Sequence, residues 1–180
     1  TEAEHALATG TLRVRKPKTM RVTFDGELDR GVSAKDLSLA LISAHGSAGG
    51  NGYVVEFAGN AVRALDVEGR LTLCNMATEF SAVTALIAPD EKIFEYLRGR
   101  TFAPRDELWD RALGYWRTLH SDDGVQFDRE IAVRTDRFAP MITWGTSPQH
   151  AVPVTGRVPR QEDSGATREA YERAIEYMGI

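Results

Sequence analysis

Two polar side chains, Asn75 and Glu79, stand out within the most apolar part of the sequence. On an α-helix, which turns by about 100° per residue, these two and Thr72 fall within a sector of roughly 60°. Glu79 is also the only charged residue between Arg70 and Asp90. A carboxylate on a buried helix is costly unless it is paired or protonated. We therefore expect Glu79 to be either a functional group whose partner lies outside this chain, or a structural group that meets an arginine from another element.

The helix that would carry this pair is predicted to run from about Glu68 to Ala82. Its apolar residues fall on nearly every side, so it is expected to be buried. Ser33 and Asp36 form a near capping box ahead of another amphipathic helix, which Gly46 ends. The alternation of elements predicts an α/β fold, with a mixed sheet flanked by helices. We expect strands at 20–24, 53–57, 85–88 (buried), 127–133 and 140–144, helices at 1–10, 34–46, 60–65, 68–82, 89–98, 106–119 and 167–178, and a loop or linker at 145–166.

Three other motifs have simpler interpretations. The glycine cluster over 46–52 follows a predicted helix and precedes a strand, whereas a phosphate-binding loop follows a strand and opens a helix. The cluster is therefore interpreted as a flexible connection or as a place of close backbone packing. The basic run over 13–21 is expected to be solvated, with an anionic partner as the alternative. Trp109, Tyr115 and Trp116 have a helical spacing that favours core packing over a ligand cage.

Length and composition set wider limits. The chain has 180 residues, of which 42% are apolar and 27% charged, as is typical of a soluble globular protein of about one domain. Its net charge of −4 argues against nucleic-acid binding, and no apolar stretch reaches the roughly 18 residues of a membrane-spanning helix. The single cysteine, Cys74, excludes a disulfide framework within the chain and favours the cytoplasm. One cysteine and four scattered histidines provide no zinc site.

The segment that contains Asn75 and Glu79 also carries a resemblance. Residues 68–79 read EGRLTLCNMATE, which resembles the EGRMTxCNMAxE segment of the aconitase superfamily. Within that superfamily, the sequence resembles more closely the large subunits of bacterial 3-isopropylmalate dehydratases. The similarity extends in order along essentially the whole chain. Its other matching segments are 4–9, 17–20, 34–36, 48–52, 55–57, 88–91, 115–119 and 143–148.

The resemblance implies the second α/β domain of the aconitase fold and a hydro-lyase that moves a hydroxyl group by dehydration and rehydration. In this branch of the family, a small hydroxy-dicarboxylate, 2-isopropylmalate, becomes 3-isopropylmalate in leucine biosynthesis. A [4Fe–4S] cluster with one open iron binds the substrate, and a separate small subunit completes the active site. The resemblance assigns catalytic roles to Asn75 and Glu79, which would hydrogen-bond the water or hydroxyl on the iron. It assigns no role to Thr72.

The chain also departs from the family pattern. The family's three cluster cysteines lie in two downstream motifs that this sequence lacks, and Cys74 is not one of them. The upstream Asp-Ser-His segment and the downstream carboxylate-binding arginines are missing as well. We therefore expect an internal piece of a longer protein that binds no cluster and shows no activity by itself. Residues 1–16 would be the tail of a preceding domain, 17–137 the α/β domain, and 138–180 a linker and the start of a following domain.

Two kinds of alternative stay open. Within the family, the large subunit of a homoaconitase or a dimethylmalate dehydratase fits the same motifs. Residues that read the substrate's side chain are expected elsewhere, including in the small subunit. A hypothesis of a different class is a non-catalytic folding or interaction module.

Overall fold

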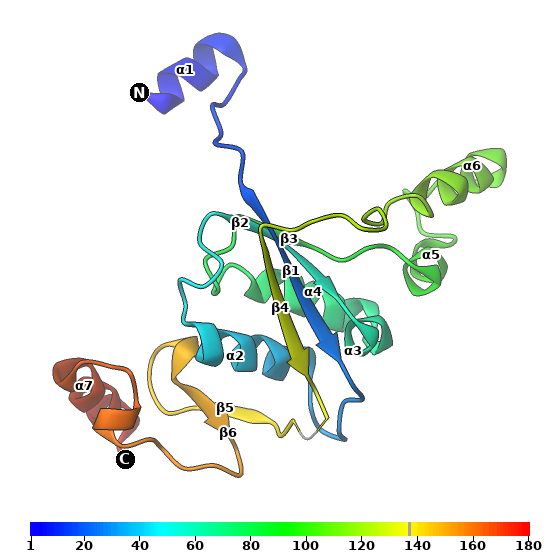
Figure 1. Cartoon of the computed structure of the whole chain (residues 1–180). Coiled ribbons are helices and arrows are strands. Elements are labelled where there is room, and N and C mark those ends of the chain that lie inside the picture. Colours follow the sequence, from blue (N-terminus) through cyan, green and yellow to red (C-terminus); the bar gives the residue numbers. More distant parts are fainter. Residues whose placement is uncertain (137) are drawn as a thin grey trace.

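Strands and helices alternate along the chain, which confirms the predicted α/β class (Figure 1). The computed structural model describes residues 1–136 and 138–180. The strands are β1 (Lys18–Asp25), β2 (Tyr53–Ala58), β3 (Thr84–Leu86), β4 (Arg129–Arg134), β5 (Met141–Thr143) and β6 (Ala151–Pro153). The helices are α1 (Glu2–Thr9), α2 (Ala34–His45), α3 (Asn60–Ala64), α4 (Val67–Met76), α5 (Glu91–Leu97), α6 (Asp106–Trp116) and α7 (Arg168–Met178), with short 3₁₀ turns η1 (Pro148–His150) and η2 (Gln161–Asp163).

Four strands form one parallel sheet in the order β3-β2-β1-β4. β1 is central, and its Met20 lies opposite Val55 of β2 and Arg129 of β4. Met20, Val22 and Phe24 are fully buried on one face, as the alternating pattern of this strand predicts. Antiparallel pairing occurs in a separate two-stranded sheet of β5 and β6. The sequence analysis predicted one mixed sheet. The structure instead has the parallel pairs in one sheet and the antiparallel pair in another.

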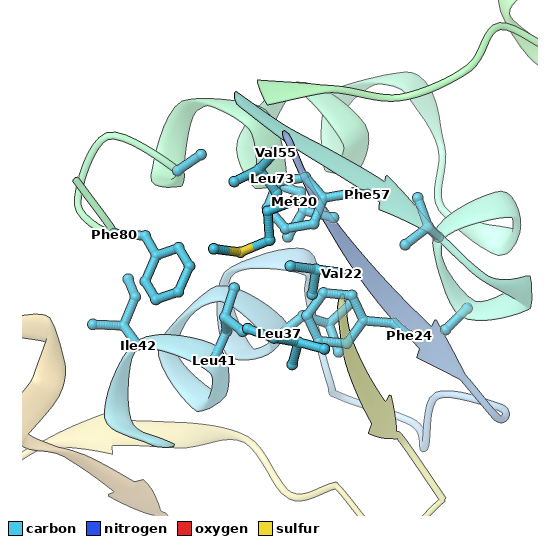
Figure 2. Packing of buried hydrophobic residues seen from close by; sticks show 14 residues of the cluster. Met20, Val22, Phe24, Leu37, Leu41, Ile42, Val55, Phe57, Leu73 and Phe80 are labelled. Carbon is cyan, nitrogen blue, oxygen red and sulfur yellow. The ribbon is translucent and has the colours of Figure 1, made fainter. Parts of the chain in front are cut away.

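The hydrophobic core lies between the larger sheet and the helices α2 and α4 (Figure 2). Leu37 and Ile42 of α2 and Leu73 of α4 are fully buried. Phe80, which follows α4, is also fully buried and belongs to the same hydrophobic cluster as Ile42 (Figure 2). Burying a large apolar side chain stabilises a protein by about 1.5–3 kcal/mol, so these residues fix α2 and the end of α4 on the sheet.

The glycine cluster after α2 packs closely against this core. A Cβ atom on Gly49 would lie 2.2 Å from the ring of Phe80, and one on Gly50 would lie 2.8 Å from it. The Gly50 amide donates to the Phe80 carbonyl oxygen over 2.8 Å. Of the two interpretations of the cluster, close backbone packing is therefore confirmed.

Two sequence predictions about the remaining elements are wrong. β3 is a three-residue edge strand in which Thr84 and Leu86 are exposed, so it is not the buried strand that its apolar residues suggest. Residues 145–166, predicted as a loop or linker, contain β6 and two short 3₁₀ turns. β6 pairs with β5, and such a pairing depends on a distant partner that local composition does not reveal.

The outlying helices α1, α5 and α6 lie away from the sheet (Figure 1). α1 has no buried residue. On α6, Trp109 is buried and packs edge-on against Trp116 with ring centroids 5.7 Å apart, whereas Tyr115 is 64% exposed. Burial is therefore confirmed for Trp109 alone, within a local aromatic cluster with the half-buried Trp116, and this cluster is separate from the core on the sheet. No helix within the described residues is long and apolar enough to cross a membrane.

Candidate functional site

The helix that carries Asn75 is shorter than predicted. α4 ends at Met76, and the chain continues in successive turns closed by hydrogen bonds between residues three apart. The Thr78 hydroxyl donates to the Asn75 carbonyl oxygen over 2.8 Å. The Glu79 amide donates to the Met76 carbonyl oxygen, so it does not continue the α-helical pattern. Ser81, in the left-handed conformation with φ 62°, closes the last turn.

This change of winding separates the two predicted site residues. Glu79 therefore lies beyond the α-helix that carries Asn75, and the predicted stripe does not continue to it as one regular helix. Both residues are exposed, and α4 buries Arg70 and Leu73 alone. The prediction of a buried helix with one polar stripe is wrong, because α4 packs on its neighbours with one side and leaves the other side open.

Arg70, the arginine of α4, forms its ion pair with Asp90 and not with Glu79. The Arg70 side chain is 4% exposed, and its guanidinium donates to both carboxylate oxygens of Asp90 over 2.8 and 2.7 Å and to the Arg63 carbonyl oxygen over 2.9 Å. Burial alone would raise the pKa of Asp90, but the hydrogen bonds and the charge of Arg70 outweigh it and lower that pKa. Glu79 forms no ion pair within residues 1–136 and 138–180. The alternative in which Glu79 is a structural group paired with an arginine is therefore not found in that part of the chain.

Glu79 lines a cavity of about 630 Å³, whose other walls are the start of α2 and the segment around β5. Met76 lines the same cavity, and Asn75 is not among its lining residues. The remaining lining residues are Ser33, Lys35, Asp36, Leu39, Met141, Ile142, Thr143, Gly145, Thr146, Ser147 and Pro148. This volume falls within the range of about 300–1,000 Å³ typical of small-molecule sites, so the cavity has room for a small organic acid.

Asp36 joins two walls of this cavity. One carboxylate oxygen, Oδ2, accepts the Ser33 amide over 2.7 Å and the Ser33 hydroxyl over 2.6 Å. The other, Oδ1, accepts the Met141 amide over 2.6 Å, which ties the start of α2 to a strand 105 residues further along the chain. Burial acts to raise the pKa of Asp36, but the hydrogen bonds from Met141 and Ser33 outweigh it and hold that pKa below its ordinary value. The carboxylate is thus an ionised link between the two walls.

The wall that follows β5 is also held from behind. Trp144 is 4% exposed, stacks on His150 with ring centroids 4.3 Å apart, and donates its amide to the His150 carbonyl oxygen over 2.9 Å. A Cβ atom on Gly145 would lie 2.3 Å from Nδ1 of His150, so this close approach requires glycine. Oγ of Ser147 lies 3.4 Å from Oγ of Ser47 in the loop after α2. Packing and hydrogen bonds therefore fix the backbone of this wall.

Sequence reasoning did not place in one site the polar residues that share the cavity with Glu79, among them Lys35, Thr146 and Ser147. Two signals were available. Asp36 stands in the capping box, and residues 143–148 form one of the segments that match the aconitase superfamily. No local pattern, however, brings the start of α2 together with a segment more than 100 residues away.

The residues present do not fit a [4Fe–4S] cluster. Such clusters are held by cysteine thiolates, and Cys74 is the single cysteine of the chain. Burial raises the pKa of the Cys74 thiol, which disfavours the thiolate. Among the residues that the structure describes, no three His, Cys, Asp or Glu side chains gather into a metal site. A cluster would need ligands from outside this chain.

Comparisons with known proteins agree on one family. The sequence pattern of the aconitase family (aconitate hydratase) matches residues 1–180. The chain is 54% identical over 181 residues to a protein of Bradyrhizobium diazoefficiens named 3-isopropylmalate dehydratase large subunit 1. The alignment covers 99% of this chain and 38% of that protein, so the chain spans well under half the length of this relative.

Proposed function

The chain belongs to the aconitase family, and we propose that it is part of the large subunit of a 3-isopropylmalate dehydratase. That protein would be a hydro-lyase that isomerises 2-isopropylmalate to 3-isopropylmalate by removing and re-adding water. The identity of 54% to a protein of that name supports this proposal. The observation that carries it is the exposed carboxylate of Glu79 on a cavity of about 630 Å³.

Removal of water from a hydroxy acid takes a hydroxyl group and a proton from neighbouring carbon atoms, so the site needs groups that accept and return protons. Glu79 suits this role because its carboxylate borders the cavity and has no ion pair within the described residues. Its carboxyl group would exchange a proton with the substrate's hydroxyl group or with the water derived from it. The family resemblance assigns Asn75 a hydrogen bond that orients the same group; Asn75 is exposed in the last turn of α4 and does not line this cavity, so its role in the proposal rests on that resemblance.

The remaining parts of the active site would belong to the rest of a longer protein and to a partner. A [4Fe–4S] cluster would be held by cysteines outside these 180 residues, and a small subunit would complete the site in the cytoplasm. The same proposal includes the domain boundaries: residues 1–16 would be the tail of a preceding domain, 17–137 the α/β domain, and 138–180 a linker and the start of a following domain. The lack of any buried residue in α1 supports the first of these boundaries.

The test uses the full-length large subunit that contains this chain, purified with its small subunit under anaerobic conditions. We expect it to interconvert 2- and 3-isopropylmalate, and Glu79→Gln to lower kcat by about 10²- to 10⁴-fold with a smaller change in KM. Glu68→Gln is the matched control, since Glu68 is exposed on α4 away from the cavity. If the enzyme converted a homoaconitase substrate or dimethylmalate and not 2-isopropylmalate, that compound would replace 2-isopropylmalate as the proposed substrate. Full activity of the Glu79→Gln enzyme would remove Glu79 from the reaction.

A further inference from the structure

The cavity that Glu79 lines also has a set of hydrogen-bond donors that the proposed function does not use. Lys35, Thr146 and Ser147 contribute these donors from two separate parts of the chain. We propose that these three residues form a subsite that binds a carboxylate group of the substrate, while Glu79 serves its hydroxyl group. This inference rests on the proposed function and adds to it the residues that recognise the acid.

Lys35 would supply the positive charge of the subsite. Its side chain is exposed and forms no ion pair within the described ranges 1–136 and 138–180. The neighbouring Asp36 directs its two carboxylate oxygens to Ser33 and Met141. An ammonium group offers three donors and a compact charge, which suits it to a carboxylate. Lys35 is thus a cation at the cavity whose partner the described residues do not supply.

Thr146 and Ser147 would supply hydroxyl donors from a wall whose backbone is already fixed. The contact of Ser147 with Ser47, at 3.4 Å, is long and leaves the Ser147 hydroxyl able to turn toward a ligand. The preceding Gly145 is confined on its other side, where an added Cβ atom would meet Nδ1 of His150 at 2.3 Å. Donors on a fixed backbone bind an anion with little loss of conformational entropy.

The charges that line the cavity favour Lys35 as the site of one substrate carboxylate, because Glu79 and the ionised Asp36 are anions. If the substrate carboxylate lay against Glu79, two like charges would share the site and one of them would have to be protonated. Binding of the carboxylate by Lys35 and the two hydroxyl groups avoids this and leaves Glu79 for the hydroxyl group of the substrate. The cavity therefore offers separate polar groups for the two chemical functions of one ligand.

The experiment separates these two functions with two ligands in the complete two-subunit enzyme. The substrate is 2-isopropylmalate, and the competitive inhibitor is isopropylsuccinate, which keeps both carboxylates and lacks the hydroxyl group. We expect Lys35→Met to raise both the KM and the inhibition constant by about 10- to 100-fold, with kcat changed by less than about threefold. Lys35→Arg keeps the charge and should restore most of the affinity. Thr146→Val combined with Ser147→Ala should raise both constants by about 3- to 10-fold.

Glu79→Gln should behave in the opposite way, with a large loss of kcat and no rise in the inhibition constant of isopropylsuccinate. Lys16→Met is the matched control, because Lys16 is exposed and does not line the cavity. An active enzyme in which Lys35→Met leaves both constants within twofold of the parent would overturn the subsite and leave the proposed function standing. An equal rise of the KM and the inhibition constant in the Lys16→Met enzyme would also overturn the subsite, because the loss of affinity would then follow from the change in net charge. A parent enzyme that does not convert 2-isopropylmalate would overturn the proposed function, and the subsite with it.

Discussion

The two ends of α4 carry charges in contrasting surroundings. Near its first turn, Arg70 is buried, and its guanidinium is held by both oxygens of Asp90 and by a backbone carbonyl group. Just beyond its last turn, Glu79 is exposed on a cavity and forms no ion pair within the described residues. The chain thus supplies a set of partners for one charge and open space for the other. A charge with a set of partners contributes to folding, whereas a charge that faces a cavity is available to a ligand.

The largest expected effect tests the first end of the helix. Arg70→Met removes the partner of Asp90 and should lower the free energy of unfolding by about 3 kcal/mol, because it leaves a partly buried carboxylate unpaired. Chemical denaturation followed by circular dichroism measures this change. Arg168→Met is the control, since its ion pair with Glu172 is exposed on α7 and should contribute about 0.5 kcal/mol or less. Equal losses in both variants would mean that burial does not distinguish the Arg70 pair from a surface pair.

The second prediction tests how the core holds the turn that carries Glu79. Gly49→Ala places a Cβ atom 2.2 Å from the Phe80 ring and 3.0 Å from the His45 carbonyl oxygen, so one of them must move. We expect a loss of about 1–3 kcal/mol in the free energy of unfolding, as for other overpacked cores. Gly114→Ala is the control, because a Cβ atom there has nothing within 4 Å in α6 and should stabilise the helix by about 0.5–1 kcal/mol. A harmless Gly49→Ala would show that Phe80 is loosely held.

The third prediction concerns Asp36, whose charge has a set of partners and also borders the cavity. Asp36→Asn should lower the free energy of unfolding at pH 7 by about 1–2 kcal/mol, because an amide cannot accept all three hydrogen bonds from Ser33 and Met141. The folded pKa of Asp36 lies below its ordinary value. The ionised form therefore contributes stability above the ordinary pKa of about 3.9, and this contribution is lost as the pH falls through the folded pKa.

The difference between the parent chain and Asp36→Asn should accordingly shrink when denaturation is repeated at about pH 3. Asp110→Asn provides the control, since Asp110 is exposed on α6 and forms no ion pair in the described part of the chain. A difference that stays constant between the two pH values would mean that the charge of Asp36 is not what links the two walls.

The sequence predicted the elements whose signals are local. The alternation of Met20, Val22 and Phe24 is sufficient to identify β1 and its buried face, and it is confirmed. The capping residues Ser33 and Gly46 mark the ends of α2, because capping depends on residues within one turn of the helix. These signals predict the α/β class and the positions of most elements.

The end of α4 and the walls of the cavity depend on contacts between segments that are distant in the sequence. The helical pattern through Glu79 continues past Met76, but the chain changes to tighter turns there, next to a core in which Phe80 packs against the glycine cluster. One oxygen of Asp36 caps α2, as the sequence indicates, and the other binds Met141, which no spacing reveals. The cavity therefore could not be predicted, although one of its residues, Glu79, could.

The smallest expected effect tests the second end of α4. Glu79→Gln keeps the size of the side chain and removes its charge. Because the side chain is exposed and has no ion pair within the described residues, we expect the free energy of unfolding to change by less than about 0.5 kcal/mol. Asp90→Asn is the contrasting control, since it weakens the pair with Arg70 and should cost more. Denaturation at low and at high salt measures both variants, and screening should leave the small Glu79 effect almost unchanged. A loss above about 1 kcal/mol for Glu79→Gln would show that this carboxylate stabilises the fold, and the contrast between the two ends of α4 would then fail.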